Sequence, residues 1–223
     1  MRENVAGACR KVGRQPEDVT LVAVTKTVSA DVARALAQAG ALDLGENRVQ
    51  ELEAKAEALR DLPIRWHMIG HLQRNKVRKA LPIAQLIHSL DSLRLAQEIN
   101  EQAAKLGRKA RVLIEVNMSG EASKFGLPPG ELERLLRAMS PLEHVVVEGL
   151  MTMPPIAADP QMSRPYFRRL RELRDAASKE KRPNMDLRHL SMGMSQDYPV
   201  AVEEGATFVR IGTALFKGLN QAG

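Results

Sequence analysis

The sequence contains almost nothing that would cross-link the chain or hold it in a membrane. It has one cysteine, Cys9, among 223 residues, which excludes an internal disulfide framework and indicates a reducing compartment. No apolar run approaches the roughly 18 residues that cross a bilayer. The opening stretch MRENVAGACRKVGRQPEDV also lacks the apolar core of a signal peptide. These absences predict a cytoplasmic protein.

Aromatic residues are also scarce, with one tryptophan, two tyrosines and four phenylalanines. The formal net charge of +6 makes nucleic acid a partner to consider. However, the basic residues alternate with acidic ones, as in YFRRLRELRDAASKEKR, and neither a stacking motif nor a Cys/His finger accompanies them. A solvated basic helix face explains this pattern better than nucleic-acid binding does. The surplus charge still favours small anions.

Short apolar runs alternate with helical patterns along the chain, and no linker or low-complexity tract interrupts them. This alternation is typical of βα units around a parallel sheet. The runs expected as strands are Thr20–Thr25, Ala41–Gly45, Arg65–Gly70, Gln85–Leu90, Ala110–Met118, His144–Met153, Leu187–Gly193 and Thr207–Gly212. Eight such units in 223 residues predict one α/β domain over residues 1–223, a (β/α)8 TIM-type barrel. An open doubly wound sheet is the alternative.

The helices between these runs have recognisable ends. One begins at Ser29 as its N-cap and ends at Gly40, and another begins at Asp91 or Ser92 and ends at Gly107. An extra helix over about residues 1–13 precedes the first strand, and we expect it to close the bottom of the barrel.

Polar residues interrupt the apolar runs where the strands end, which is where barrels place their active sites. Lys26 ends the first run in LVAVTKT, Asn47 follows the second in GEN, and His67 lies in the third. A lysine at the rim of an apolar core either reaches water or serves as the amine that forms a Schiff base.

The last two strand ends carry the signs of an anion site. Gly212 and Thr213 follow the eighth run at the expected start of the final helix, and Ser195 follows the seventh at a second helix start. Helix N-termini bind phosphate, and the loops after strands seven and eight commonly do so in barrels. Ordinary N-caps are the alternative interpretation of these residues.

A phosphate site, an arginine and a lysine around one barrel mouth suggest pyridoxal 5′-phosphate (PLP), which has an aldehyde, a phosphate and a ring nitrogen. Arg210 in the eighth run is the candidate partner of the ring nitrogen, or else it forms an ion pair with a phosphate or carboxylate. A protonated arginine donates to the ring nitrogen without protonating it, so the ring is a weaker electron sink.

The motifs LVAVTKT, GENRVQE, WHMIGHLQRNK, VNMSGEASKFG, EGLMTM and LSMGMSQDYPVAVEEGATFVRIGTALFKG run in this order across nearly the whole chain. In them the sequence resembles the pyridoxal phosphate homeostasis proteins, relatives of the alanine racemase barrel domain (PLP fold type III). The departures, Thr25 where serine is frequent and Lys217 in FKG, touch no inferred role. The resemblance implies these cofactor-binding residues: Lys26 as the Schiff-base lysine, Ser195, Gly212 and Thr213 at the phosphate, Arg210 at the ring nitrogen, and Asn47 and His67 beside the ring.

The resemblance also implies a monomer that carries and buffers PLP for apo PLP-dependent enzymes and maintains vitamin B6 and amino-acid balance without established catalysis. A racemase of this barrel type needs a tyrosine from an added β domain, and this sequence ends at Gly223, directly after the eighth unit. Tyr166 and Tyr198 fall in or beside expected helices. A low-activity amino-acid racemase and a cofactor-independent Schiff-base barrel acting on sugar phosphates remain alternatives.

Two further groups of residues are candidate sites. Lys124 in GEASKFG follows the fifth run and is either a second amine near the mouth or a solvated loop lysine. His67 and His71 form no metal pattern, because no further cluster of cysteine, histidine or carboxylate accompanies them. We therefore expect no metal site.

Overall fold

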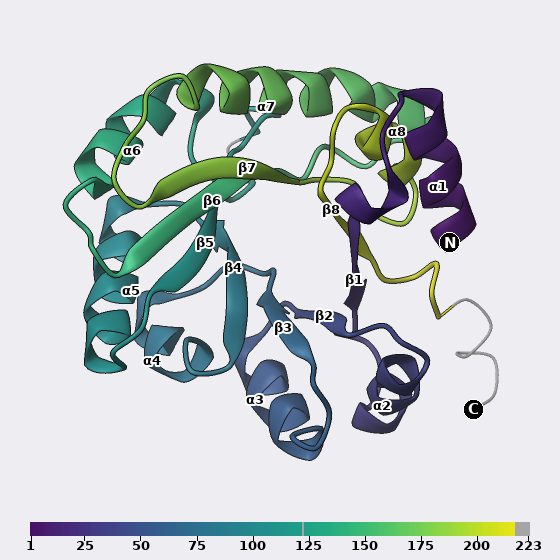
Figure 1. Cartoon of the computed structure of the whole chain (residues 1–223), viewed down its shortest axis with the longest axis horizontal. Coiled ribbons are helices and arrows are strands. Elements are labelled where there is room, and N and C mark those ends of the chain that lie inside the picture. The colour runs from purple at the N-terminus through teal and green to yellow at the C-terminus, as the bar shows by residue number, and fades with distance from the viewer. Residues whose placement is uncertain (122, 217–223) are drawn as a thin grey trace.

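A computed structural model describes residues 1–121 and 123–216, and these form a closed barrel of parallel strands in the order β1 to β8 (Figure 1). Each strand pairs with the next along the chain, and β1 pairs with β8 through rungs such as Ala23 opposite Ile211. The strands are β1 Thr20–Val24, β2 Asp43–Glu46, β3 Arg65–Met68, β4 Ala84–Leu90, β5 Ala110–Glu115, β6 Val145–Met151, β7 Met185–Ser191 and β8 Phe208–Ile211.

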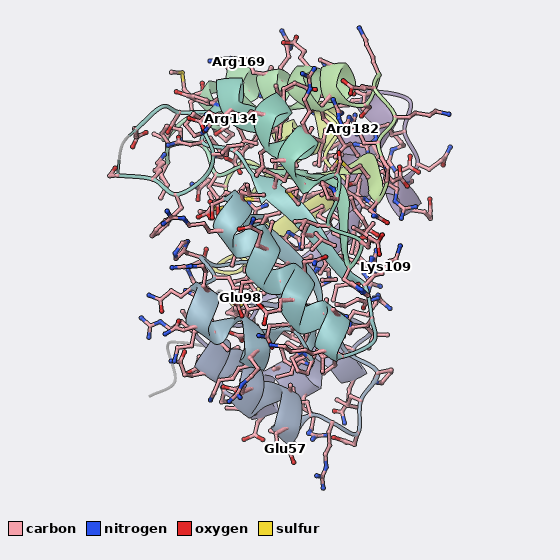
Figure 2. The ribbon with its side chains drawn as sticks, turned by 90° about the vertical axis from the view of Figure 1, so that its left-hand side faces the viewer. Glu57, Glu98, Lys109, Arg134, Arg169 and Arg182 are labelled. Carbon is pink, nitrogen blue, oxygen red and sulfur yellow. The ribbon has the colours of Figure 1, made fainter. Side chains whose placement is uncertain are left out.

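Helices follow the strands and surround the sheet, as Figure 1 shows. They are α1 Arg2–Lys11, α2 Ala30–Gln38, α3 Val49–Ala58, α4 Val77–Ala80, α5 Leu93–Lys105, α6 Leu132–Met139, α7 Arg164–Ala177 and α8 Tyr198–Glu203. Charged side chains such as Glu57 and Arg169 project from this outer layer (Figure 2). Among the described residues, no helix combines the length and the apolar character needed to cross a bilayer.

The barrel prediction is confirmed, and the open doubly wound sheet is wrong because β1 and β8 pair. The fifth run ends earlier than expected, since β5 stops at Glu115. The reason is local: the side-chain oxygen of Asn117 accepts hydrogen bonds from the Ser119 hydroxyl and the Gly120 N–H, at 3.0 Å each, which turns the chain.

Helix α1 precedes β1 as expected. It packs beside α8 (Figure 1), and its first turn reaches the loop before β2, where Arg2 donates to the Gly40 carbonyl at 3.0 Å. Asn4 donates to the Tyr198 hydroxyl at 3.0 Å, and Lys11 pairs with Glu203 at 3.1 Å. These contacts hold α1 against α8.

The two faces of the sheet differ in chemistry. The face toward the helices, here called the outer face, belongs to one continuous apolar cluster that includes Leu44, Ile114 and Leu190. The face toward the barrel axis, the inner face, contributes a separate and much smaller apolar cluster consisting of Val22, Leu86, Leu113, Met151 and Phe208. Successive residues of a strand point to opposite faces, so each strand supplies both.

Candidate functional site

Lys26 follows β1 at the carboxyl end of the barrel. The Val28 N–H donates to the Thr25 carbonyl at 3.1 Å, so the chain turns at Lys26. Lys26 comes two residues after the last residue of β1 and is exposed. The lysine therefore lies at the carboxyl-end rim of the barrel.

A buried ion pair fixes the chain immediately before Lys26. The Thr25 hydroxyl donates to Glu46 Oε1 at 2.6 Å, and Lys55 Nζ lies 2.7 Å from the same oxygen. Lys55 also donates to the Thr25 carbonyl at 2.6 Å. All three residues are buried. Sequence analysis gave no role to Glu46 or Lys55; the signal available was a carboxylate at the very end of an apolar run.

The turns after β7 and β8 meet at the hydroxyl of Ser195. Ser195 Oγ lies 3.3 Å from the backbone N–H groups of Gly212 and Ala214 and 3.2 Å from the Thr213 hydroxyl. Converging N–H and O–H donors of this kind are suited to a phosphate. The structure thus brings together the three residues expected at an anion site.

The N-cap interpretation of Ser195 is wrong. Helix α8 begins at Tyr198 with Asp197 as its N-cap, and Asp197 accepts from the Met194 N–H at 2.7 Å. Gly193 makes this turn possible, because it has φ +92° and an added Cβ would meet the Ala201 Cβ at 2.5 Å. The final helix expected after Thr213 lies outside the described residues.

Arg210 lies on the inner face of β8 and is 4% exposed. Its Nη1 donates to the Ser191 hydroxyl at 2.5 Å, and its Nη2 donates to the Thr152 carbonyl at 2.9 Å. Burial lowers the pKa of Arg210 to about 10, against the opposing charges of Glu115 and Asp197. The side chain is still a cation at neutral pH, and a guanidinium has five N–H donors, so further donors remain for a ligand.

Glu115 is a titratable group that sequence analysis missed. It ends β5 and is 3% exposed. Burial raises the pKa of Glu115 to about 7, although the nearby charge of Arg210 acts in the opposite direction. The sequence signal was an acid inside the apolar run VLIEV. The site therefore includes a carboxyl group that can gain or lose a proton near neutral pH.

The two candidates from β2 and β3 lie in different settings. Asn47 follows β2, and a Cβ on Gly70 would come within 2.3 Å of its carbonyl oxygen, so the ends of β2 and β3 approach closely. His67 is buried on the inner face of β3. Both of its ring nitrogens are engaged, Nδ1 with His88 at 2.9 Å and Nε2 with Asp43 at 3.1 Å. No ring nitrogen of His67 remains for a ligand.

Lys124 lies in the turn after β5, where its Nζ is 3.1 Å from Glu121. His71 and Phe125 stack with their ring centres 4.1 Å apart. Within the described part of the chain, no group of three or more histidine, cysteine or acidic residues is placed to hold a metal ion.

The donor set fits PLP. Lys26 offers an amine, the Ser195 and Thr213 hydroxyls with the neighbouring N–H groups offer a phosphate cradle, and Arg210 offers a donor for the ring nitrogen. A Cβ on Gly212 would meet Val24 at an ordinary 3.5 Å, so packing within the fold does not demand glycine there. When bound, PLP supplies an aldehyde that reacts with amines and an electron-withdrawing ring.

The fold and site define a class of parallel barrels that gather a lysine, an arginine and an anion cradle at neighbouring strand ends. Residues 1–220 match the family described as alanine racemase, N-terminal domain. The pyridoxal phosphate homeostasis protein of Aquifex aeolicus is 49% identical over 96% of this chain and 93% of its own length. That of Escherichia coli is 36% identical over 97% and 92%. The chain belongs to this family of pyridoxal phosphate homeostasis proteins.

Solved structures agree with this assignment. PipY of Synechococcus elongatus, solved with PLP bound, is 38% identical, covers 95% of this chain and 99% of its own, and superposes with a TM-score of 0.84. An unknown protein from Bifidobacterium adolescentis gives 0.91 at 38% identity, over 96% of this chain and 91% of its own. The alanine racemase of Clostridium difficile shares the fold, with a TM-score of 0.70 at 18% identity, over 96% of this chain and 59% of the racemase.

Proposed function

We propose that this protein binds PLP at the barrel mouth and carries and buffers it for other enzymes, which keeps vitamin B6 and amino-acid levels in balance. One observation carries the proposal: the anion cradle at Ser195 follows β7, the buried cation Arg210 lies on β8 and the rim amine Lys26 follows β1, and these three strands are neighbours in the closed barrel. The PLP-bound structure of PipY and the names of the relatives support it.

Each residue of the proposed site has a distinct task. Lys26 is the covalent attachment point for the aldehyde, and Arg210 donates to the ring nitrogen. The Ser195 and Thr213 hydroxyls and the N–H of Gly212 hold the phosphate. Asn47 and His67 complete the surroundings of the ring, with His67 acting through its neighbours because both of its nitrogens are engaged.

Weak catalysis follows from the same groups. Arg210 remains protonated and so leaves the ring nitrogen without a proton, which limits the stabilisation of a carbanion. Neither tyrosine serves the mouth: the Tyr198 hydroxyl bonds Asn4 on the flank at 3.0 Å, and Tyr166 lies on α7. A slow amino-acid racemase is the second candidate function, and Glu115 is the observation that favours it, since its pKa of about 7 suits a general base.

The attachment point is tested by borohydride reduction of PLP-loaded protein followed by peptide mass analysis. We expect the added mass on the peptide that contains Lys26, and we expect Lys26→Ala to lose the visible absorption band. The matched control is Lys124→Ala, which removes the lysine in the turn after β5 and should keep both signals. Mass found on Lys124 in the wild type would refute the assignment of Lys26.

Two measurements on PLP-loaded protein distinguish a carrier from a racemase. Mixed with an apo PLP-dependent enzyme, a carrier restores that enzyme's activity. Incubated with L-alanine in heavy water, a carrier incorporates little deuterium at the α-carbon. Turnover on the order of 10 per second, which is typical of a working enzyme, would instead support the racemase. Glu115→Gln would then lower that turnover.

A further inference from the structure

A continuous chain of polar side chains crosses the barrel interior from the mouth to the opposite end. In order, the members of this chain, here called the interior relay, are Arg210, Ser191, His88, His67, Asp43 and Arg65. They come from the inner faces of β8, β7, β4, β3 and β2. Every member except Arg65 is buried.

The distances show unbroken hydrogen bonding. Below Arg210, the Ser191 hydroxyl is 2.8 Å from His88 Nδ1, and His88 Nε2 is 2.9 Å from His67 Nδ1. His67 Nε2 is 3.1 Å from Asp43 Oδ1. Asp43 in turn accepts from Arg65 through Nε at 2.8 Å and Nη2 at 2.5 Å. No member of the relay is left without a partner.

Chemistry at the two ends limits where the protons can lie. Arg210 is a donor only, so the Ser191 oxygen accepts from it and the Ser191 hydrogen can donate to His88. At the other end the Asp43 carboxylate is an acceptor only, so His67 donates from Nε2. With both rings neutral, only one arrangement completes the chain: His88 donates from Nε2 to His67 Nδ1, and the relay runs in one direction.

The surroundings support a neutral ring at His88. The ring of Phe208 lies against His67, His88 and His189, with ring centres 5.7, 5.5 and 4.8 Å away. Burial lowers the pKa of His88 well below its usual value, and the charge of Arg210 acts in the same direction.

We propose that Ser191, His88 and His67 are positioning residues that hold the Arg210 guanidinium against the cofactor's ring nitrogen and connect it to the Asp43–Arg65 ion pair at the far end of the barrel. This deepens the proposed function and rests on it. The relay orients the buried guanidinium of Arg210 and links it to the negative charge of Asp43 at the far end of the barrel. Hydrogen bonds arranged head to tail strengthen one another.

The far end of the relay reaches solvent. The Arg65 side chain is 48% exposed. Asp43 and Arg65 also line a hollow of about 730 Å³ between α1 and α2, at the amino-terminal ends of β1 to β3. The ion pair that ends the relay therefore lies at the barrel end opposite to the mouth, where substitutions do not touch the proposed cofactor site.

The direction of the relay is tested without any cofactor. Nitrogen-15 NMR of the histidine rings in cofactor-free protein, assigned with His67→Gln and His88→Gln, should show both rings neutral with the proton on Nε2 at neutral pH. A proton on Nδ1 of either ring, or a doubly protonated ring, would overturn the relay. This result is independent of whether the protein binds PLP.

The positioning role is tested on PLP-loaded protein. Ser191→Ala and His88→Gln should each raise the Kd for PLP about tenfold, as expected for one hydrogen bond to a charged group, and should shift the visible absorption maximum. The control is His189→Gln, which changes a neighbouring inner-face histidine that bonds Thr207 at 3.1 Å instead. It should leave both readouts at wild-type values, and the thermal midpoint of each variant reports whether it is folded.

The two proposals fail in different ways. If wild-type protein does not bind PLP, the proposed function is wrong, and the NMR result alone decides the relay's direction. If wild-type protein binds PLP but Ser191→Ala and His88→Gln match His189→Gln in Kd and spectrum, the positioning role is refuted and the proposed function stands.

Discussion

The outer face of the barrel sheet contributes mainly to stability, whereas the inner face contributes mainly to the candidate site. The outer face is sealed by one apolar cluster under the helices. The inner face, which in barrels of this type is usually filled by layers of branched aliphatic residues, has a small apolar cluster of Val22, Leu86, Leu113, Met151 and Phe208. The rest of its side chains are largely polar, and they include the interior relay.

The difference shows what a polar barrel interior requires. A buried polar group is costly unless it is hydrogen-bonded, and a partly satisfied network is worse than an apolar one. Here His67, His88 and Asp43 are fully partnered. We infer that the outer face holds the barrel together, while the inner face is arranged around Arg210. We therefore expect substitutions on the outer face to lower the free energy of unfolding and substitutions on the inner face to weaken PLP binding.

The largest expected effect is on the outer side. Phe167 on α7 is fully buried, and Phe167→Ala should lower the free energy of unfolding by about 3–5 kcal/mol, since truncating a buried aromatic leaves a cavity. Denaturant unfolding measures this. The matched control is Phe125→Ala, because Phe125 is 56% exposed and should cost under about 1 kcal/mol. Equal losses in the two variants would contradict the division.

Behind Lys26 the outer face carries a buried charge pair, which sharpens the comparison. Glu46→Gln leaves the buried Lys55 with only the half-exposed carboxylate of Glu51 at 3.8 Å, and we expect a loss of about 3 kcal/mol in unfolding free energy. Combining it with Lys55→Met removes both charges and should restore most of the loss. A double variant as unstable as the single one would show that the charge pair is not the cause.

For substitutions on the inner side of the barrel, we expect weaker PLP binding rather than a lower free energy of unfolding. Ser195→Ala should weaken PLP binding by about 1.5–3 kcal/mol, because the lost hydrogen bond has a charged acceptor. Thr213→Val should act in the same direction. The control ligand is pyridoxal, which lacks the phosphate and should bind the variants and the wild type equally. A matching loss for pyridoxal would place the phosphate elsewhere.

The smallest effect is a pH dependence at the far end of the relay. Burial raises the pKa of Asp43, but the hydrogen bonds from Arg65 and His67 outweigh it and bring the pKa from 3.8 to about 2. A lowered pKa means that the stabilisation is present above about pH 4 and is lost as pH falls through 2. It amounts to about 1–2 kcal/mol with solvent screening.

Acid unfolding of the wild type and of Asp43→Asn tests this expectation. The asparagine keeps the shape but does not titrate, so its unfolding free energy should change less between pH 4 and pH 2. Parallel curves for the two proteins would show that Asp43 does not contribute to the acid sensitivity.

Much of the architecture was predictable because it depends on local signals. Alternating apolar runs and helix ends such as Ser29, whose hydroxyl accepts from the Val32 N–H at 3.4 Å, are encoded within a few residues. The end of β5 at Glu115 and the packing of α1 on α8 were missed, since an Asn117 turn and a flank contact are decided by their surroundings.

The residues of the candidate site were likewise predicted in part and missed in part. Lys26, Ser195, Gly212, Thr213 and Arg210 were found because parallel strands deliver their ends to one mouth, and the structure brings Ser195 within 3.3 Å of the turn after β8. Their roles toward PLP remain predictions. Glu115 and the Glu46–Lys55 pair were missed, because burial and a partner on another element, rather than sequence position, make them unusual.

By itself, the sequence determined the order of strands and helices, the closure expected of eight such units, and the strand ends at which polar residues would gather. Only the tertiary structure decided which inner-face residues meet. His67 and His88 are 21 residues apart, and His88 and Ser191 are 103 apart, yet each pair is hydrogen-bonded. These contacts depend on strand register, which shifts between Trp66 and His67 and between Ile87 and Leu90. Periodicity in the sequence predicts on which face of the sheet a residue lies. The strand register and the closure of the barrel determine which residue it contacts across the interior.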